Sequence, residues 1–485
     1  MTTAVHLVSL GCSRNDVDSE ELAARLDAEG FCLVDDPDQA EVIMVNTCGF
    51  IEQAKKDSID TLLSAADHKA SGQARAVVAV GCMAERYGNE LAAALPEADA
   101  VLGFDSYPQI AAKLRTILAG GHVASHEPKD RRTLLPLMPA ARQAAAHDMR
   151  APLAVPGHGA SRLALDTADR DADHRPLLGP PVLRRRLHGG PFAPLKIASG
   201  CDRRCAFCAI PSFRGSYLSR PADEIIAEAH WLAGEGVKEI MLVSENSSSY
   251  GKDLGRPRAL PDLLERLTEV DGLEWIRVSY LQPAEITPEI LKAMACVPKV
   301  VPYFDLSFQH ASGPLLRRMR RFGDAEQFLN LISRVRALAP QAGIRSNFIV
   351  GFPGETDDDV QILADFLDEA QLDVAGVFSY SPEDGTEGAT MDGGLDPDEI
   401  DERHEAISSL IDEVCNQRAA DRIGERVQVL VENTDDGEIS GRAAHQGPEV
   451  DGTTSLIAVD RPAIGDLVDA VVVGSEGVDL MAEVA

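Results

Sequence analysis

The stretch SGCDRRCAFCAIPSFRG, residues 199–215, places Cys201, Cys205 and Cys208 in one short loop. The residues just before it, PLKIA at 194–198, are mostly apolar and typical of a short buried strand. A loop that follows a strand lies at the carboxyl end of a parallel sheet, where β/α folds build their active sites. Three clustered cysteines favour a metal over a disulfide framework in so long a chain. The stretch therefore predicts a metal site at the edge of a β/α domain.

The loop offers three thiols, whereas structural zinc sites and closed 4Fe–4S clusters take four protein ligands. Three cysteines can hold three irons of a 4Fe–4S cluster and leave the fourth iron open to chelate a small molecule. The alternatives are a zinc site that borrows a remote ligand, or a set of buried structural cysteines. Phe207, an aromatic residue directly before the last cysteine, and the position after a strand favour the cluster.

The segment CDRRCAFC, residues 201–208, resembles the cluster loop of the radical S-adenosylmethionine superfamily, whose spacing is C-x₃-C-x-φ-C. The resemblance implies that S-adenosylmethionine binds the open iron through its amino and carboxylate groups. One electron from the cluster would then cleave the sulfonium and produce a 5′-deoxyadenosyl radical. The protein would orient the reactants and exclude water.

Outward from this loop, strand and helix patterns alternate from residue 191 to residue 418. The strand candidates are 195–199, 239–245, 275–281, 303–309, 345–352 and 376–380. Amphipathic stretches with helical spacing separate them, and a longer one at 398–420 ends the unit. A closed barrel of this kind has eight β/α units, so six units predict an open, partial (β/α)6 barrel.

A second alternation of strand and helix patterns, over residues 1–125, predicts an N-terminal domain built on a parallel sheet. Cys12, Cys48 and Cys82 each stand at the end of a predicted strand. Because the carboxyl ends of parallel strands meet at one edge, three loops can bring these thiols together. Buried structural cysteines are the alternative. The repeated placement favours a second metal site with three cysteines.

Two further segments differ from these β/α units. Residues 126–190 are rich in proline, show no periodicity and carry a net charge of +4 in an acidic chain. They predict a linker or insertion that is at least partly disordered. Residues 419–485 contain five short strand patterns separated by turn residues, which predicts a small all-β, OB-like barrel.

The order of these parts, with two cysteine triads, resembles the radical S-adenosylmethionine methylthiotransferase family. That family has an N-terminal cluster domain, a radical domain and a C-terminal TRAM domain. The resemblance implies two 4Fe–4S clusters, one on Cys12, Cys48 and Cys82 and the other on Cys201, Cys205 and Cys208. The N-terminal cluster would carry sulfur. One S-adenosylmethionine would methylate this sulfur. The methylthio group would then be delivered to a substrate carbon that is activated by the radical from a second S-adenosylmethionine.

The resemblance also implies positions that contact S-adenosylmethionine. Glu245, at the end of the second barrel strand, is the candidate partner of the methionine amino group. The full set of candidate contacts is Phe207, Glu245, Asn246, Asp305, Gln309, Gly351 and Glu355. At each position a packed loop or a helix cap is the alternative. No catalytic side chain beyond the cluster ligands is predicted.

Charge distinguishes the targets of the family's branches, which are an adenosine in transfer RNA and an aspartate of small-subunit ribosomal protein twelve. Residues 421–485 hold 14 acidic and 4 basic side chains, and the whole chain has a net charge of −32. This tail would repel the phosphates of RNA and attract a basic ribosomal protein. The sequence thus favours transfer of a methylthio group to the β-carbon of the aspartate. The transfer-RNA reaction is the alternative.

A function of another class, an iron–sulfur electron carrier, fits less well, because carriers generally close the fourth ligand position. The N-terminus has no basic region followed by a long apolar core, and no apolar run is long enough to span a bilayer. We therefore expect a cytoplasmic monomer. It would need an electron donor and the ribosomal protein, or the subunit carrying it, as partners.

Overall fold

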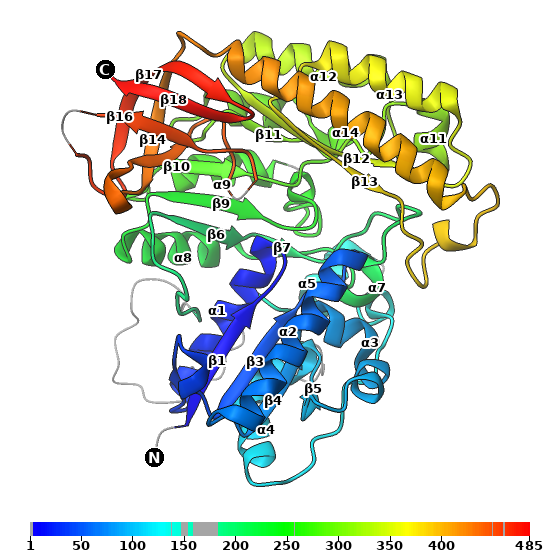
Figure 1. Cartoon of the computed structure of the whole chain (residues 1–485), viewed down its shortest axis with the longest axis vertical. Helices are drawn as coiled ribbons and strands as arrows, with labels where there is room; N and C mark the ends of the chain where they lie inside the picture. Colours follow the sequence, from blue (N-terminus) through cyan, green and yellow to red (C-terminus); the bar gives the residue numbers. More distant parts are fainter. Residues whose placement is uncertain are drawn as a thin grey trace.

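The computed structural model of the chain describes residues 3–136, 138–146, 154–158, 183–256, 258–448, 450–458 and 461–485. An N-terminal sheet domain, a central β/α domain and a C-terminal barrel follow one another along the chain (Figure 1). This arrangement confirms the predicted fold class. Within these ranges, no helix is both long enough and apolar enough to cross a membrane.

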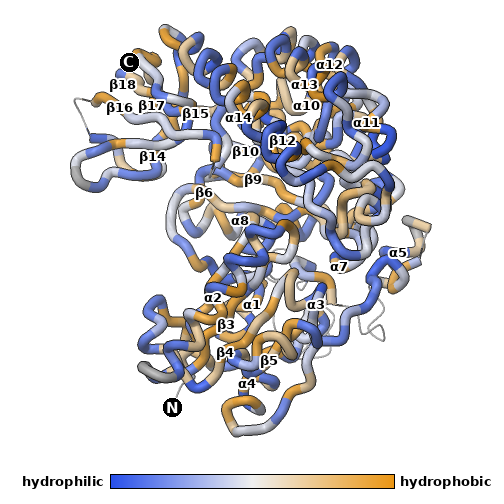
Figure 2. Tube along the Cα trace, turned by 45° about the vertical axis from the view of Figure 1, so that its right-hand side comes forward, coloured by the Kyte–Doolittle hydropathy of each residue, from blue (hydrophilic) through white to orange (hydrophobic). Residues whose placement is uncertain are grey.

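The N-terminal domain is a five-stranded parallel sheet in the order β2-β1-β3-β4-β5. Its strands are β1 Ala4–Ser9, β2 Cys32–Leu33, β3 Val42–Thr47, β4 Ala76–Val80 and β5 Ala100–Val101. Its helices are α1 Ser13–Ala28, α2 Glu52–Ser71, α3 Gly81–Ala94 and α4 Ile110–Leu118. The apolar runs of β3 and β4 are buried along their whole length, and Figure 2 shows both as hydrophobic. The edge strand β2 was not expected, because two residues carry no periodic pattern.

Six parallel strands cross the central domain in two hydrogen-bonded groups, β10-β9-β6 and β11-β12-β13. Single bridges from Ile276 to Val300 and from Leu281 to Leu306 join the two groups into an open, six-stranded partial barrel. Its strands are β6 Phe192–Lys196, β9 Glu239–Val243, β10 Trp275–Val278, β11 Tyr303–Asp305, β12 Gly343–Val350 and β13 Val374–Ser379. Its helices are α8 Ala222–Gly234, α9 Ala259–Leu267, α10 Pro288–Cys296, α11 Gly313–Arg318, α12 Ala325–Leu338, α13 Asp357–Ala370 and α14 Pro397–Ala420.

Local sequence sets the first turns of the last two helices. The Thr356 side chain accepts a hydrogen bond from the Asp359 backbone, while the Asp359 carboxylate accepts one from the Thr356 backbone, which forms a capping box for α13. Asp396 caps α14, and Pro397 occupies its first position, where no backbone donor is needed. These caps fix the loop after β12, which carries two of the candidate cofactor contacts.

The described parts of residues 126–190 are docked rather than free, which differs from the expected linker. They include the short helix α5 Pro139–Ala146. Three arginines of this segment are buried in ion pairs: Arg131 with Glu85 at 2.8 Å, Arg142 with Asp202 at 2.6 Å, and Arg184 with Glu228 at 2.7 Å. Proline-rich composition gave no sign of these contacts, because each partner is distant in the sequence. Residues 137, 147–153 and 159–182 lie outside the described ranges.

Five strands close into the C-terminal barrel in the order β14-β15-β16-β18-β17, as the turn-separated pattern predicts. They are β14 Arg426–Asn433, β15 Ser440–Ala443, β16 Thr454–Ile457, β17 Leu467–Glu476 and β18 Asp479–Val484. The barrel is fixed to the central domain by buried ion pairs. Glu239 of β9 lies 2.6 Å from both Arg277 and Arg442. Burial opposes its ionisation, but the two arginines outweigh burial and lower the pKa of Glu239.

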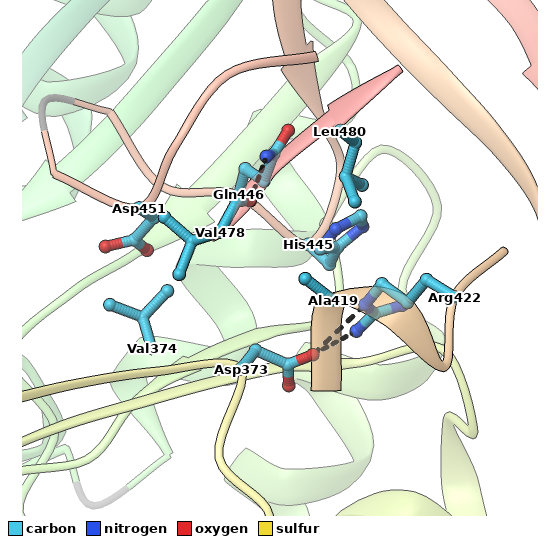
Figure 3. Close-up of a pocket in the computed structure, with 9 residues that line it drawn as sticks. All are labelled: Asp373, Val374, Ala419, Arg422, His445, Gln446, Asp451, Val478 and Leu480. Carbon is cyan, nitrogen blue, oxygen red and sulfur yellow. Dashed lines mark hydrogen bonds and ion pairs between the residues drawn. The ribbon is translucent and has the colours of Figure 1, made fainter. Parts of the chain in front are cut away.

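A second buried contact joins the barrel to the end of α14 (Figure 3). Arg422 pairs with Asp373, which precedes β13, and the ring of His445 lies beside them in the same small pocket. Burial, with a further contribution from Arg422, lowers the pKa of His445 to about 3. His445 is therefore neutral when the barrel is packed against the central domain.

Candidate functional site

The CDRRCAFC loop follows β6 and is closed at its base by a small hairpin. Its two strands are β7 Ala198–Ser199 and β8 Leu218–Ser219. Gly200 has a φ of +80°, and a Cβ there would lie 2.4 Å from the Ser216 carbonyl oxygen, so only glycine fits. The Cys201 backbone donates to the Gly215 carbonyl at 3.0 Å. The hairpin and the glycine thus hold the three thiols at the carboxyl end of the sheet.

The three thiols of this loop lie close enough to influence one another. Burial raises the pKa of Cys201, and the neighbouring Cys208 and Cys205 raise it further. Burial likewise raises the pKa of Cys208 to about 12. In the absence of a metal such thiols keep their protons at neutral pH, so they do not act as free nucleophiles. Arg321 lies near the group, 3.7 Å from the Cys205 sulfur.

The N-terminal triad assembles at the corresponding edge of its own sheet. Cys12 precedes the first turn of α1, Cys48 directly follows β3, and Cys82 lies in the first turn of α3 after β4. Gly11 has a φ of +98°, and a Cβ there would lie 2.9 Å from the Cys48 sulfur. The strand ends therefore place the three cysteines at one edge, as the sequence predicts.

Electrostatics differ among the three thiols of the N-terminal triad. Burial raises the pKa of Cys82 to about 12; Arg214 opposes the rise, and the Cys48 and Cys12 thiols add to it. Burial also raises the pKa of Cys48. At Cys12 burial acts in the same direction, but Arg14 and Arg214 outweigh it and lower the pKa. The pKa of Cys12 is therefore lowered, whereas the pKa values of Cys48 and Cys82 are raised.

Two arginines beside the N-terminal triad cross between the N-terminal and central domains. Arg14, on α1, donates from Nε to the Cys12 sulfur at 3.4 Å, and its guanidinium lies 4.6 Å from the centre of the Tyr280 ring in the central domain. Its charge also lowers the pKa of Cys208, against the larger effect of burial. Arg14 therefore acts on thiols of both triads.

Arg214 reaches in the opposite direction, from the end of α7 Ile210–Arg214 in the central domain to the N-terminal domain. It donates to Asp18 at 2.8 Å, to Asn15 at 2.9 Å and to the Cys82 sulfur at 3.0 Å. Asp18 also pairs with the buried Lys196 of β6. The two domains thus share a buried charged network beside the N-terminal triad.

Glu245, the candidate partner of an amino group, lies between these arginines. Its carboxylate is 3.9 Å from both Arg14 and Arg214, and only 2% of the side chain is exposed. The buried Oε2 atom makes no hydrogen bond to a described residue. An unpartnered buried carboxylate oxygen fits an incoming ammonium group. The neighbouring Asn246 donates to Ser249 and Glu285, at 2.9 and 3.2 Å.

Asp305 and Gln309 follow one another at the carboxyl end of β11. Asp305 accepts from the Tyr280 backbone at 2.9 Å, and burial raises its pKa. Gln309 has a φ of +73° and exchanges backbone hydrogen bonds with β12, through Asn347 and Ile349. Both lie at the same end of the barrel as the cysteine loop, and their cofactor contacts stay predictions.

Gly351 and Glu355 form a structural contact with α14. Glu355 accepts from the Gly351 backbone at 2.7 Å and pairs with Arg403 at 2.9 Å, while its Oε1 atom lies 3.3 Å from the His310 ring without a hydrogen bond. A Cβ on Gly351 would lie 2.7 Å from Ile400. This geometry matches the packed-loop alternative. Phe207 is half-buried and packs against the central core.

The donor set at each triad fits a 4Fe–4S cluster with one open iron. Over the described ranges, no three His, Cys, Asp or Glu side chains lie close enough to hold a single metal ion. A cluster makes a different demand, because each cysteine binds its own iron and the thiols need not converge on one point. Three clustered thiols with no fourth cysteine suit this arrangement.

Several residues of the site carry no motif in the sequence. They are Arg14, Asn15, Arg214, Tyr280 and Arg321. From the sequence alone, Arg14 and Arg214 resemble ordinary surface residues, because their partners lie in another domain. Their only sequence signal is closeness to a cysteine: Arg14 follows Cys12 by two residues and Arg214 follows Cys208 by six.

Three family models match the chain in order. Residues 4–103 match Uncharacterized protein family UPF0004, residues 195–367 match the Radical SAM superfamily and residues 423–485 match the TRAM domain. Among solved structures, the radical S-adenosylmethionine methyltransferase TsrM from Kitasatospora setae is similar with a TM-score of 0.50. At 14% identity, covering 78% of this chain and 73% of that one, the likeness concerns the fold. Fold and site together define a radical S-adenosylmethionine protein with a second cysteine triad.

Curated relatives are similar over almost their entire length. A protein of Cutibacterium acnes named "Ribosomal protein uS12 methylthiotransferase RimO" is 64% identical, covering 99% of this chain and 98% of that protein. Proteins with the same name from Nocardioides sp. and Streptomyces coelicolor are 59% and 57% identical, with coverage of 98% and 99% of this chain and 96% of each relative. The chain belongs to the RimO family of ribosomal protein uS12 methylthiotransferases.

Proposed function

We propose that the protein transfers a methylthio group to the β-carbon of an aspartate in ribosomal protein uS12, with S-adenosylmethionine and two 4Fe–4S clusters. Cys201, Cys205 and Cys208 hold one cluster, and Cys12, Cys48 and Cys82 hold the other. When bound, the first cluster and S-adenosylmethionine supply a radical that removes a hydrogen atom, and the second cluster supplies sulfur. An unactivated carbon needs this chemistry, because no side-chain base removes such a proton at neutral pH.

The observation that supports this proposal is the position of Arg14, which binds a cysteine of the N-terminal triad and reaches Tyr280 and Glu245 of the central domain. It donates to the Cys12 sulfur, and its guanidinium lies 4.6 Å from the centre of the Tyr280 ring and 3.9 Å from Glu245. A carbon held beside Arg14 would lie between the N-terminal triad and the barrel mouth that carries the second triad, as sulfur insertion requires. The remaining residues exclude water and orient the reactants. Glu245 is proposed to hold the amino group of S-adenosylmethionine, with Asn246, Asp305 and Gln309 along the same edge.

The barrel supports a basic protein as substrate. Two of its four basic residues, Arg422 and Arg442, are consumed in buried ion pairs. Among the described residues from 421 on, eight acidic residues are exposed: Asp421, Asp435, Glu438, Asp466, Asp469, Glu476, Asp479 and Glu483. This surface attracts a basic ribosomal protein and repels RNA phosphates. We further propose that the protein acts as a cytoplasmic monomer that takes its electrons from an external one-electron donor.

The test compares two substrates under identical anaerobic, reducing conditions. Purified uS12 or its ribosomal subunit is one substrate, and transfer RNA is the other. Mass spectrometry should find a gain of one SCH₂ unit on an aspartate of uS12 and none on an adenosine. A uS12 variant with asparagine at the target position is the matched control. Modification of transfer RNA alone would replace the proposed substrate and leave the cluster assignment standing.

A further inference from the structure

Arg14 is a guanidinium with unused donors at the junction of the two triads. Over the described residues its one hydrogen bond runs from Nε to the Cys12 sulfur. Its Nη1 atom is 3.9 Å from Glu245, beyond hydrogen-bond distance. Guanidinium carries five N–H donors in a planar fork, so both terminal nitrogens have capacity left. The side chain is 12% exposed, which leaves it within reach of a bound molecule.

Arg214 provides the contrast within the same network. Its terminal nitrogens are engaged by Asp18, Asn15 and Cys82, all within 3.0 Å. Its side chain is 4% exposed. Arg214 therefore joins the domains, whereas Arg14 keeps a free fork that points to an additional partner. A planar fork of donors is the preferred protein partner of a carboxylate, which it binds through two parallel hydrogen bonds.

We propose that Arg14 binds the carboxylate of the substrate aspartate and thereby holds the adjacent β-carbon between the two triads. This inference rests on the proposed function. In an aspartate the carboxylate carbon is bonded directly to the carbon that is modified, so fixing one fixes the other. An asparagine presents one acceptor and one donor group to a fork that only donates. Arg14 is therefore a specificity-determining residue that selects aspartate over asparagine.

The same chemistry has a second source, the methionyl carboxylate of S-adenosylmethionine. The location of Arg14 favours the substrate. Arg14 contacts Cys12 of the sulfur-carrying triad directly, although it also lies 3.9 Å from Glu245, the candidate partner of the amino group of S-adenosylmethionine. The experiment therefore measures both ligands separately.

The test is a double-mutant cycle on the reconstituted protein with both clusters. Peptides from uS12 with aspartate or with asparagine at the target position are titrated by fluorescence polarisation against wild type, Arg14→Gln and Arg14→Lys. The wild type should bind the aspartate peptide about 10- to 100-fold more tightly, the range of a charge-assisted hydrogen bond. Arg14→Gln should bind both peptides alike. Arg14→Lys keeps the charge but loses the planar fork, so its preference for the aspartate peptide should lie between those of the wild type and Arg14→Gln.

Arg115→Gln is the matched control, because it removes the same charge at the far end of the domain. Arg115 pairs with Glu29, beyond the last turn of α1, and is 52% exposed. This variant should keep the full preference for aspartate. S-adenosylmethionine binding, measured by equilibrium dialysis, should be unchanged in every variant.

Three results would overturn the inference. Arg14→Gln could keep the preference for the aspartate peptide while the wild type still modifies aspartate, which would leave the proposed function intact. Weaker S-adenosylmethionine binding with unchanged peptide preference would assign the fork to the cofactor. Loss of iron in both Arg14→Gln and Arg14→Lys would assign Arg14 to holding Cys12. Failure of the proposed function is recognised separately, by wild-type protein that modifies transfer RNA and no aspartate.

Discussion

The two cysteine triads of this protein reach similar arrangements by different routes. One triad occupies eight consecutive residues, 201–208, in a loop closed by a small hairpin. The other draws on residues 12, 48 and 82, which only the parallel sheet brings together. The first site is local and the second depends on tertiary structure. Its integrity must follow the packing of the domains around it.

The largest effect is expected when the three cysteines of the loop at 201–208 are removed. Replacing Cys201, Cys205 and Cys208 with alanine should reduce 5′-deoxyadenosine formation to background. Iron should fall from about eight to about four per chain, because each cluster holds four. Both are measured on anaerobically purified protein with S-adenosylmethionine and a reductant. Reductive cleavage that persists in this variant would show that the loop does not hold the radical cluster.

The matching change in the dispersed triad, Cys12, Cys48 and Cys82, should stop methylthiolation without stopping the cleavage of S-adenosylmethionine. Replacing Cys12, Cys48 and Cys82 with alanine should also remove about four irons, but 5′-deoxyadenosine should still form, because the radical loop is untouched. Methylthiolation of uS12 should cease. Continued methylthiolation would mean that these cysteines are core residues and that the comparison of two cluster sites is wrong.

A smaller effect tests whether the dispersed site depends on the domain interface. Asp18 pairs with both Lys196 and Arg214, and Arg214→Met removes the second of these partners. Because the pair between Asp18 and Arg214 is buried, breaking it costs about 3 kcal/mol or more. The variant should lose its N-terminal cluster at lower denaturant concentration than the radical cluster. Arg115→Ala, which breaks an exposed pair, should cost less than about 1 kcal/mol. Equal loss of both clusters in Arg214→Met would contradict this dependence.

The smallest effect concerns the barrel interface, another contact between distant segments. His445 has a folded-state pKa of about 3, below its unfolded value of about 6.5. Its stabilising contribution is fully present above about pH 6.5 and is lost as the pH falls toward 3, by about 1.4 kcal/mol per pH unit. His445→Gln should flatten this slope between about pH 7 and 5. Urea unfolding followed by the fluorescence of Trp275, which donates to Gln428 of the barrel, measures it.

The sequence predicts features that depend on local pattern. The cysteine loop, the strand-end position of the dispersed triad, the six barrel units and the closed β-barrel all follow from spacing and periodicity. The family models and relatives support the same reading of the whole chain. The positions of the two cysteine triads could be predicted because the end of a strand can be recognised from the sequence pattern.

Contacts between distant segments are beyond the reach of such patterns. Arg214 and the Cys82 sulfur are 132 residues apart, and nothing near either residue indicates the other. Glu355 shows a contact that its loop sequence does not reveal, since its carboxylate pairs with Arg403, 48 residues away, while its cofactor contact stays a prediction. The buried arginines of residues 126–190 were missed for the same reason.

The central proposal is that the two clusters lie close together, on either side of the junction where Arg14 meets Cys12, Tyr280 and Glu245, and the magnetic interaction between them tests it most directly. Electron paramagnetic resonance of the fully reduced wild-type protein should show broadened, fast-relaxing spectra from two interacting clusters. Either triple-cysteine variant should show the narrow spectrum of one isolated cluster. A wild-type spectrum equal to the sum of the two variants' spectra would place the clusters far apart and contradict the account.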